Sequence, residues 1–185
     1  MREAPVAARK EAARHGGIQL QTPWRRVCAL TADSAVPLTP SLDSESMAQS
    51  DDDLFGDEHV RVYRETAGEH GYQWRGTTIL LLTTEGRSSG EPRTTPLIHR
   101  TDSDRWVVVA SKGGAPENPS WLENLKANPD AAIQVKGEEV PVHATTAEGE
   151  ERSRLWSLMT EVWPAYDDYQ ARTDRVIPVV VLSRR

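Results

Sequence analysis

The sequence predicts an α+β fold, a small and mostly antiparallel β-barrel with helices packed on its outside. Short β-branched and apolar segments recur as hairpin-like pairs. The elements follow in the order helix, three strands, helix, two strands, helices, strand. Strand–helix–strand alternation with a glycine-rich phosphate fingerprint does not occur, which disfavours a doubly wound parallel sheet. Because one core serves roughly 100–200 residues, we expect one folded domain over residues 47–185.

Local patterns place the first half of these elements. Asp53 can cap a helix over about 54–67, with Phe55, Val60, Val62 and Tyr63 on one side, and glycines follow it. The apolar run 77–84 lies between two glycines and is too short for a helix, so it predicts a buried strand. Segments 94–99 and 105–110 then predict a hairpin around a polar turn.

The second half is punctuated by proline and by capping residues. Asn118-Pro119 is typical of a helix start, and Asn128-Pro129 stops that helix. A second hairpin is expected over 131–135 and 139–144. The run Thr145-Thr146-Ala147-Glu148 resembles a capping box before a helix that Pro164 ends or bends. Residues 177–182 predict the last strand.

Composition and charge exclude several classes of protein. The formal net charge of −6 disfavours a general nucleic-acid binder. Cys28 is the only cysteine, so an intrachain disulfide framework is excluded and a reducing cytoplasm fits. Apolar runs stay well below the roughly 20 residues of a membrane span, and the N-terminus lacks the apolar core of a signal peptide. We expect a cytoplasmic protein without an integral membrane span.

Residues 1–46 differ in composition from the rest. Their positive and negative side chains nearly balance, four prolines interrupt them, and only 37% of the whole chain is apolar. We expect a disordered extension that precedes Met47. The alternative is a basic amphipathic anchor formed by 7–14 and 24–26, which would touch a membrane or the tail of a cofactor.

Two loops are candidates for binding anions. The run 86–93 places Arg87 and Arg93 among glycines and serines between two predicted strands. The run 110–119 leaves a strand and enters a helix, so the amides of Gly113 and Gly114 and the ammonium of Lys112 could converge on one anion. The alternative for each loop is a solvated connection.

A third group of residues is aromatic. Trp163, Tyr166 and Tyr169 recur every three residues and could wall a pocket with phenols that donate hydrogen bonds, although such stripes often belong to the core. Trp74, Trp106, Trp121 and Trp156 are expected as packing residues, with Trp121 close enough to the second loop to border a ligand. The histidines lack zinc-ligand spacing, so no metal site is expected. No serine elbow is present either, so reactivity is expected from a phosphate-bearing cofactor.

Three separated motifs carry a resemblance to a known family. They are the segment 81–97, the segments 110–114, 118–121 and 124–129, and the segments 163–170 and 173–180. In this order they resemble the deazaflavin-dependent nitroreductases of actinobacteria, over about residues 54–182. The resemblance implies a split β-barrel of the FMN-binding kind and a preference for coenzyme F420, an 8-hydroxy-5-deazaflavin with a phosphate and a polyglutamate tail.

The resemblance also implies residue roles. The cofactor would be held by Arg87, Arg93, Pro96, Ser111, Lys112, Gly113, Gly114, Trp121 and Asn124. The substrate would be faced by His99, Trp163, Tyr166 and Tyr169, with Tyr166 and Ser111 donating hydrogen bonds during the reaction. Ser88 stands where many relatives have lysine, which leaves the preferred tail length open.

The expected activity is transfer of a hydride from reduced F420 to an electron-poor small molecule, such as a quinone, an enone or a nitroaromatic compound. One alternative is an FMN-dependent oxidoreductase on the same barrel. Another is a carrier that binds deazaflavin without reducing anything. The partner is a small-molecule substrate and no nucleic acid is expected. Monomer and homodimer both remain open, as does peripheral contact with the inner face of the membrane.

Overall fold

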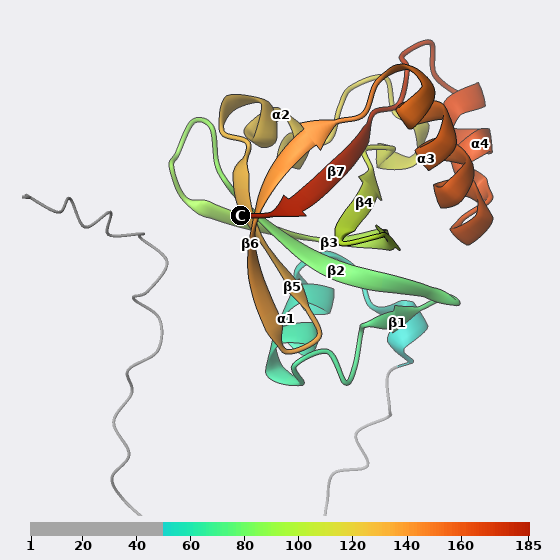
Figure 1. Cartoon of the computed structure of the whole chain (residues 1–185). Coiled ribbons are helices and arrows are strands. Elements are labelled where there is room, and N and C mark those ends of the chain that lie inside the picture. Colours follow the sequence, from blue (N-terminus) through green and yellow to red (C-terminus); the bar gives the residue numbers. More distant parts are fainter. Residues whose placement is uncertain (1–49) are drawn as a thin grey trace, which may run out of the picture. The chain divides into compact units, whose positions relative to one another are not determined.

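The computed structural model describes residues 50–185, and the expectations for residues 1–46 lie outside them. Six antiparallel strands close into a barrel, which confirms the predicted fold class (Figure 1). Around the barrel the strands are β2 (Thr77–Glu85), β3 (Pro92–Asp102), β4 (Arg105–Val109), β7 (Val179–Arg184), β6 (Glu138–Thr146) and β5 (Asp130–Val135). Pairing of β5 with β2, where Ile133 lies opposite Leu82, closes the barrel. A short β1 (Gln73–Trp74) pairs antiparallel with the start of β2 and has no counterpart among the predicted strands.

The helices lie outside the barrel. They are η2 (Asp51–Asp53), α1 (Gly56–Glu65), η3 (Lys112–Gly114), α2 (Ser120–Ala127), α3 (Gly149–Val162) and α4 (Ala165–Ala171). Helix α1 lies against one side, and α3 and α4 lie together against another (Figure 1). None of the helices described in residues 50–185 is long and apolar enough to cross a membrane.

Strand β2 is apolar on both faces because both faces are covered. Leu80 and Leu82 point into the barrel and pack with residues of β4, β5 and α2. Ile79 and Leu81 alternate with them and point outward, where they pack with Tyr63 of α1. A strand buried on both sides reads as a continuous apolar run, which is why the segment 77–84 was recognisable from the sequence.

A second outer cluster fixes the position of α3 and α4. Val107 and Val109 of β4 point away from the barrel interior and pack with Leu155, Met159 and Tyr166 of these helices. The expected break at Pro164 is present, since α3 ends at Val162 and α4 begins at Ala165. Tyr166 is therefore held in place by packing against the outer face of β4.

The predicted helix caps are wrong, whereas the helices themselves are present. Asp53 lies in η2, and α1 begins at Gly56 after Phe55, which is 57% exposed. Thr145 and Thr146 belong to β6, because pairing with β7 continues past the point where a capping box would start the helix. All four α-helices of residues 50–185 begin without a side-chain cap.

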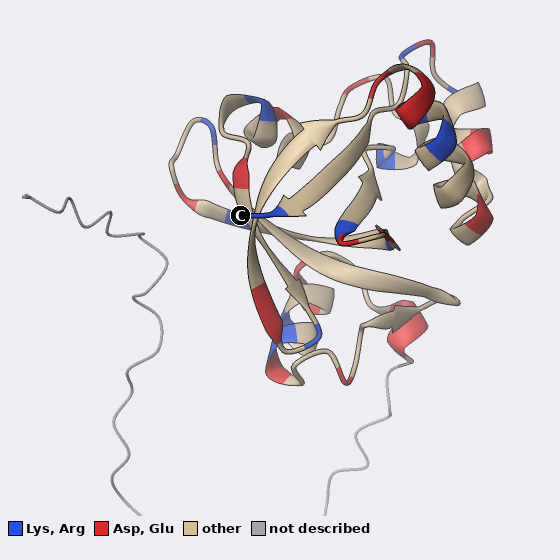
Figure 2. Ribbon diagram, in the orientation of Figure 1, with Lys and Arg blue, Asp and Glu red and all other residues tan. Residues whose placement is uncertain are grey.

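Charged side chains occupy helices and turns, and the barrel strands are mostly uncharged (Figure 2). Asp102 at the β3–β4 turn accepts hydrogen bonds from Arg154 of α3 at 2.9 and 2.8 Å and from Arg105 at 2.8 Å. These guanidinium groups lower the pKa of Asp102 to about 2. The carboxylate thus fastens α3 to the hairpin beneath it.

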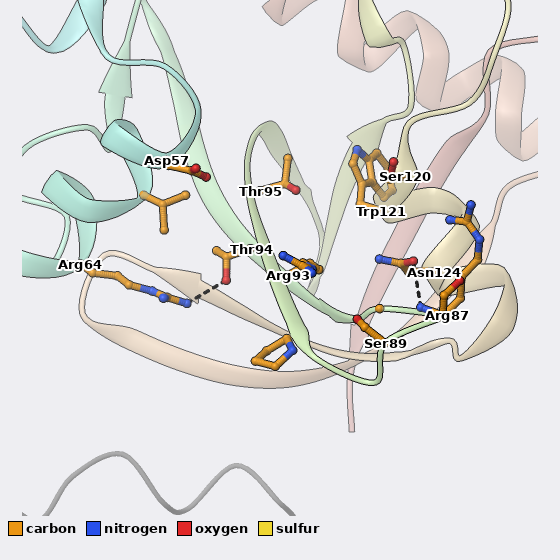
Figure 3. Close-up of a pocket in the computed structure, with 14 residues that line it drawn as sticks. Asp57, Arg64, Arg87, Ser89, Arg93, Thr94, Thr95, Ser120, Trp121 and Asn124 are labelled. Carbon is orange, nitrogen blue, oxygen red and sulfur yellow. Dashed lines mark hydrogen bonds between the residues drawn. The ribbon is translucent and has the colours of Figure 1, made fainter.

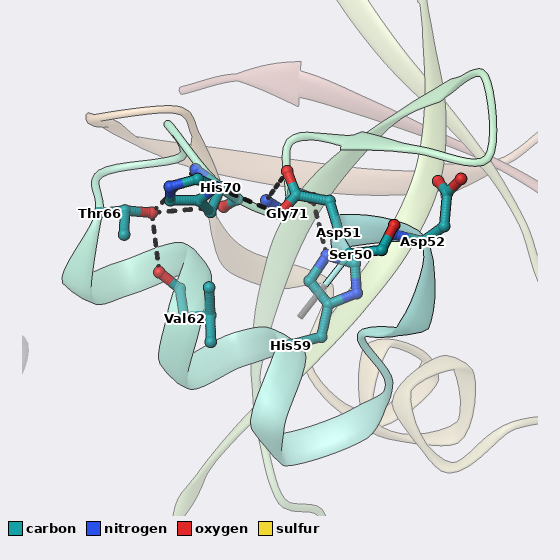
Figure 4. A network of polar contacts seen from close by, with 8 residues as sticks. All are labelled: Ser50, Asp51, Asp52, His59, Val62, Thr66, His70 and Gly71. Atoms are coloured by element: carbon teal, nitrogen blue, oxygen red, sulfur yellow. Dashed lines mark hydrogen bonds and ion pairs between the residues drawn. The ribbon is translucent and has the colours of Figure 1, made fainter. Parts of the chain in front are cut away.

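A polar network holds the segment before α1 (Figure 4). The carboxylate of Asp51 accepts from the amide of Gly71 at 3.0 Å and pairs with the ring of His70 at 3.3 Å. The buried ring of His59 contacts the carbonyl oxygen of Gly71 through Nε2 at 2.7 Å. The network joins η2 and α1 to the turn before β1, and so fixes the residues Leu54 to Gly56.

Candidate functional site

Two neighbouring cavities lie between the barrel and its helices. The first, of about 650 Å³, is here called the arginine cavity and is lined by Asp57, Arg64, Arg87, Arg93, Thr95, Trp121 and Asn124, among others. The second, of about 360 Å³, is called the aromatic cavity and is lined by Phe55, Trp74, Pro96, Ser111, Trp163, Tyr166 and Tyr169, among others. Thr95 of β3 lines both. A ligand that passes this residue can occupy the two cavities together.

Three arginines line the arginine cavity, with Arg64 next to Thr94 on one side, Arg93 in the middle and Arg87 beside Asn124 on the other side (Figure 3). Arg64 comes from α1, Arg87 from the β2–β3 loop and Arg93 from β3. Arg64 donates to the hydroxyl of Thr94 at 2.9 Å, which orients it along the strand. Guanidinium forks suit phosphate and carboxylate groups, and Asp57 is the one carboxylate among the lining residues. The cavity is suited to a ligand with several negative charges.

The β2–β3 loop is shaped from within and held by α2. The amide of Gly86 donates to the carbonyl of Glu91 at 2.8 Å, and a Cβ at Gly86 would lie 2.7 Å from the hydroxyl of Ser89. Buried Asn124 of α2 accepts from the amide of Arg87 at 3.2 Å and donates to the hydroxyl of Thr84 at 3.1 Å. The expected role of Asn124 in bracing the site therefore has a structural counterpart.

The aromatic cavity has walls that suit a flat ring. Trp74 lies 5.8 Å from Trp163 and 5.4 Å from Phe55 between ring centroids. Tyr166 and Tyr169 meet edge to face at 6.1 Å. Faces and edges arranged in this way favour contact with further aromatic rings. Trp74 was expected in the core, and the structure instead places it in this wall.

Tyr166 is the best placed proton donor of the aromatic cavity. Its side chain is 4% exposed, and its hydroxyl has no hydrogen-bond partner within residues 50–185. Burial, together with the neighbouring Tyr169, raises the pKa of Tyr166 well above its usual value. The phenol therefore stays protonated at neutral pH and is free to donate to a bound ligand.

The second predicted loop meets the aromatic cavity rather than the arginine cavity. Ser111 and Gly113 line it, whereas Lys112 and Gly114 line neither cavity. The Lys112 ammonium lies 3.5 Å from the carboxylate of Glu117. The prediction that the amide of Gly114 is free to bind an anion is wrong, because this amide donates to the carbonyl of Ser111 at 3.0 Å. The two loops thus serve different cavities, and the cofactor role of Lys112 stays a prediction.

His99 is not brought to either cavity. Its neighbour Ile98 lines the aromatic cavity, and adjacent residues on a strand point to opposite faces. His99 is consequently buried beyond the cavity wall, 6.2 Å from the ring of Tyr72, and its Nδ1 has no partner among the described residues. His99 was expected to contact the substrate, but its neighbour Ile98 on β3 lines the cavity instead.

Burial of His99 predicts a pH dependence of stability. Burial lowers its pKa from 6.5 to about 4, so the folded protein keeps the ring neutral where the unfolded chain would protonate it. Stability should be full above pH 6.5 and be lost as the pH falls toward 4, by up to about 3 kcal/mol. Urea unfolding of the wild type and of His99→Gln between pH 4 and 7 checks this. An equal slope in both proteins would contradict it.

Several lining residues were missed by sequence reasoning. Arg64, Phe55 and His59 lie on or beside α1, whose helical pattern was visible but whose packing partner was not. Ile98 looks like an ordinary strand residue. Alternation along β3 would have indicated it, since Pro96 and Ile98 share one face. Arg64 carries no local signal, because only contact between α1 and β3 brings it to the cavity.

The two cavities together fit a redox cofactor with a planar ring and an anionic tail. The ring matches the aromatic walls and the tail matches the three arginines. The predicted cofactor residues divide accordingly, with Arg87, Arg93, Trp121 and Asn124 in one cavity and Pro96, Ser111 and Gly113 in the other. Trp163, Tyr166 and Tyr169, predicted to face the substrate, line the aromatic cavity together.

Comparison with known proteins gives consistent matches. A family model described as F420H(2)-dependent quinone reductase matches residues 56–184. The chain is 44% identical over 131 residues to the F420H(2)-dependent quinone reductase Rv1261c of Mycobacterium tuberculosis, an alignment covering 69% of this chain and 88% of that protein.

Solved structures agree with these matches. The F420-H2 dependent reductase FDR-A is 43% identical, with a TM-score of 0.54, over 57% of this chain and 93% of that one. A structure described as a domain-swapped dimer is 40% identical, with a TM-score of 0.57, over 67% of this chain and 92% of that one.

Proposed function

Because the chain belongs to the F420H(2)-dependent quinone reductase family, we propose that it reduces quinones in its aromatic cavity with F420H2 as the reductant. The observation that carries this proposal is the contact of the arginine cavity with the aromatic cavity at Thr95. The arrangement allows one elongated cofactor to place its anionic part in the first cavity and its ring in the second. The resemblance seen in the sequence and the expected cofactor are confirmed by the family.

The residues of each cavity have distinct tasks in holding the cofactor. Reduced deazaflavin supplies a hydride when it is bound. Arg64, Arg87 and Arg93 would hold the phosphate and the tail carboxylates, because guanidinium groups pair with such oxygens in forked geometry. Pro96 and Ser111 would line the ring at the other side of Thr95.

The acceptor would be bound and polarised by the aromatic cavity. Trp74 and Trp163 can stack on a flat quinone, which orients it and excludes water. The hydroxyls of Tyr166 and Ser111 can donate to the oxygen on which negative charge accumulates. Enones and nitroheteroarenes carry an oxygen of the same kind, so we propose them as further acceptors.

The decisive experiment mixes the purified protein with F420H2 and menadione without oxygen. We expect the absorbance of oxidised F420 to return over many turnovers, with one equivalent of menadione reduced per cofactor. Parallel titration with FMN and F420 should quench tryptophan fluorescence with F420 only. Binding of F420 without turnover would instead favour the carrier, and saturation by FMN with turnover from reduced FMN would favour the flavin enzyme.

Replacing Tyr166 by phenylalanine should lower kcat about 10- to 100-fold while the dissociation constant of F420 changes little. The reason is that the ring still fills its buried position, and only the donor to the developing charge is lost. Stopped-flow reduction of menadione by the variant measures the effect. Tyr169→Phe is the matched control, since Tyr169 is more exposed beside the same cavity. Full turnover by Tyr166→Phe on every acceptor would remove Tyr166 from this role.

The oligomeric state and the location of the protein can be tested with the same purified protein. We propose a cytoplasmic enzyme for small-molecule substrates, with a homodimer supported by the relative described as a domain-swapped dimer. Size-exclusion chromatography with light scattering should then give twice the mass of 20.6 kDa. Sedimentation of the full chain with lipid vesicles tests for peripheral membrane contact. Loss of this sedimentation on deletion of residues 1–46 would show that the segment supplies the contact.

A further inference from the structure

Arg175 is the most fully hydrogen-bonded side chain beside the aromatic cavity, and no role in the reaction has been assigned to it so far. It lies between α4 and β7. Its Nη2 donates to the carbonyls of Ala110 at 3.1 Å and Ser111 at 2.8 Å. Its Nε donates to the carbonyl of Ala115 at 2.8 Å, and its Nη1 donates to the Asn118 side chain at 3.0 Å. One guanidinium group therefore binds the loop 110–118 at four points.

These contacts determine where the amides of the loop point. In a trans peptide the N–H lies opposite the C=O. Since the carbonyls of Ala110 and Ser111 face Arg175, the amides of Ser111 and Lys112 face away from it. Ser111 has right-handed helical angles and Lys112 has a φ of +47°, a sequence that makes successive N–H groups converge. Within residues 50–185 neither amide has a hydrogen-bond acceptor.

The side of the loop away from Arg175 is the side of the aromatic cavity. Ser111 and Gly113 line that cavity, and Arg175 does not. Tyr166 also lines this cavity. The amides of Ser111 and of the adjoining Lys112, together with the hydroxyls of Ser111 and Tyr166, are therefore donors available to one ligand oxygen, with Ser111 and Tyr166 in the lining of the cavity and the Lys112 amide next to it in the chain. Such a set resembles the donor groups that stabilise developing oxyanions in other enzymes.

We propose that Arg175 is a positioning residue, which holds the peptides of Ala110 and Ser111 so that the amides of Ser111 and Lys112 donate to the acceptor oxygen. This inference rests on the proposed function and names the group that completes the donor set of the same cavity. The acceptor class is a compound whose oxygen gains negative charge on reduction, such as a quinone. Arg175 does not touch the acceptor and acts through the backbone.

Arginine is suited to this task for two reasons. Its five N–H donors lie in one rigid plane, so a single side chain can bind several carbonyls, which the ammonium of lysine cannot do in the same geometry. Its positive charge next to two carbonyl oxygens also polarises both peptides, which strengthens their amides as donors. No carboxylate of residues 50–185 forms an ion pair with Arg175, so its charge acts on the loop.

The test compares Arg175→Lys with Arg152→Lys in the full chain. Arg152 is a matched control because its Nη2 donates at 3.0 Å to the carbonyl of Ile177, two residues after Arg175, and it lines neither cavity. We expect Arg175→Lys to lower kcat roughly 10- to 100-fold, as small misplacement of reacting groups does. The dissociation constant of F420 should change less than about threefold, and Arg152→Lys should leave kcat within about twofold.

Chemical rescue separates positioning from general loosening of the fold. Methylguanidinium added at millimolar concentration to Arg175→Ala should restore part of the lost kcat in a saturable way, and should not affect Arg152→Ala. Should Arg175→Ala fail to fold, Arg175→Lys and its unchanged F420 affinity decide the question. Unchanged kcat in Arg175→Lys, or an equal loss of kcat in Arg152→Lys, would overturn the role of Arg175. The proposed function would still stand in that case, provided that the wild-type protein is active. Absence of wild-type activity would instead refute the proposed function.

Discussion

Replacement of Arg87 and Arg93 together by alanine should weaken binding of F420 about 10²- to 10⁴-fold. Each charge-assisted hydrogen bond contributes roughly 1.5–3 kcal/mol, and every 1.4 kcal/mol is tenfold in affinity. Both side chains are exposed, and neither forms an ion pair within the described residues. The structure uses the backbone amide of Arg87, not its guanidinium, to hold the loop. The loss should therefore fall on the ligand and not on the fold.

Isothermal titration with oxidised F420 measures this loss, and thermal unfolding checks that the fold is kept. Arg184→Ala with Arg185→Ala removes the same charge from side chains that pair with Glu138 and Asp130 and line neither cavity. This control should keep its affinity within about threefold. Added salt should weaken wild-type binding more steeply than binding by the Arg87 and Arg93 variant, because screening acts on the charges that were removed. Equal affinity in wild type and double variant would show that the tail lies elsewhere.

Replacement of Gly114 by alanine should destabilise the protein by about 2–4 kcal/mol and lower Tm by roughly 6–20 °C. Gly114 has a φ of +83°, where a side chain adds strain of about 1–2 kcal/mol. A Cβ there would also lie 2.7 Å from the carbonyl oxygen of Tyr169 and 3.1 Å from its Cα. Because both atoms belong to the backbone, η3 and α4 would have to separate. Tyr166 and Tyr169 would then leave their positions in the aromatic cavity, and activity would fall as well.

Gly149→Ala is the matched control for this variant. Gly149 has a φ of +55° but nothing within 4 Å of the position of its Cβ, and it lines neither cavity. Gly149→Ala should lower the stability of the protein only by the backbone strain of the positive φ, about 1 kcal/mol. Differential scanning calorimetry of both variants measures the difference, which isolates the overlap with α4. Equal losses of stability in the two variants would show that the contact with Tyr169 does not limit the approach of η3.

Local patterns were sufficient for the barrel strands and failed for the helix starts. The runs 77–84 and 105–110 are apolar because most of their side chains are buried, so the hydrophobic pattern along the chain indicates the buried strand directly. Helix starts here depend on where neighbouring strands stop pairing. Thr145 and Thr146 have the side chains of a capping box, but pairing of β6 with β7 satisfies their backbone instead. The same two residues could cap a helix or continue a strand, and only the pairing of β6 with β7 in the folded chain decides between these alternatives.

The candidate site shows the same division. Arg87, Arg93, Ser111 and Tyr166 were identified from loops and motifs whose residue types suit anions or oxyanions. Arg64 was missed because nothing around it in the chain differs from a solvated helix face. His99 was misplaced because a shift of one residue on a strand reverses the face of the side chain. Gly114 was assigned to ligand binding, although its amide donates to the carbonyl of Ser111, whereas the cofactor role of Lys112 stays a prediction.

The sequence by itself determined the class of the fold, the succession of its strands and the identity of the two loops, because each depends on residues close together in the chain. Only the tertiary structure decided that the loops serve different cavities, that Thr95 joins these cavities, and that Arg175 orients the peptide of Ser111 from 64 residues away. The reason is physical. Propensity and spacing act over a few residues, whereas closure of the barrel by β2 and β5 and the packing of α4 on η3 join segments whose separation leaves no local trace.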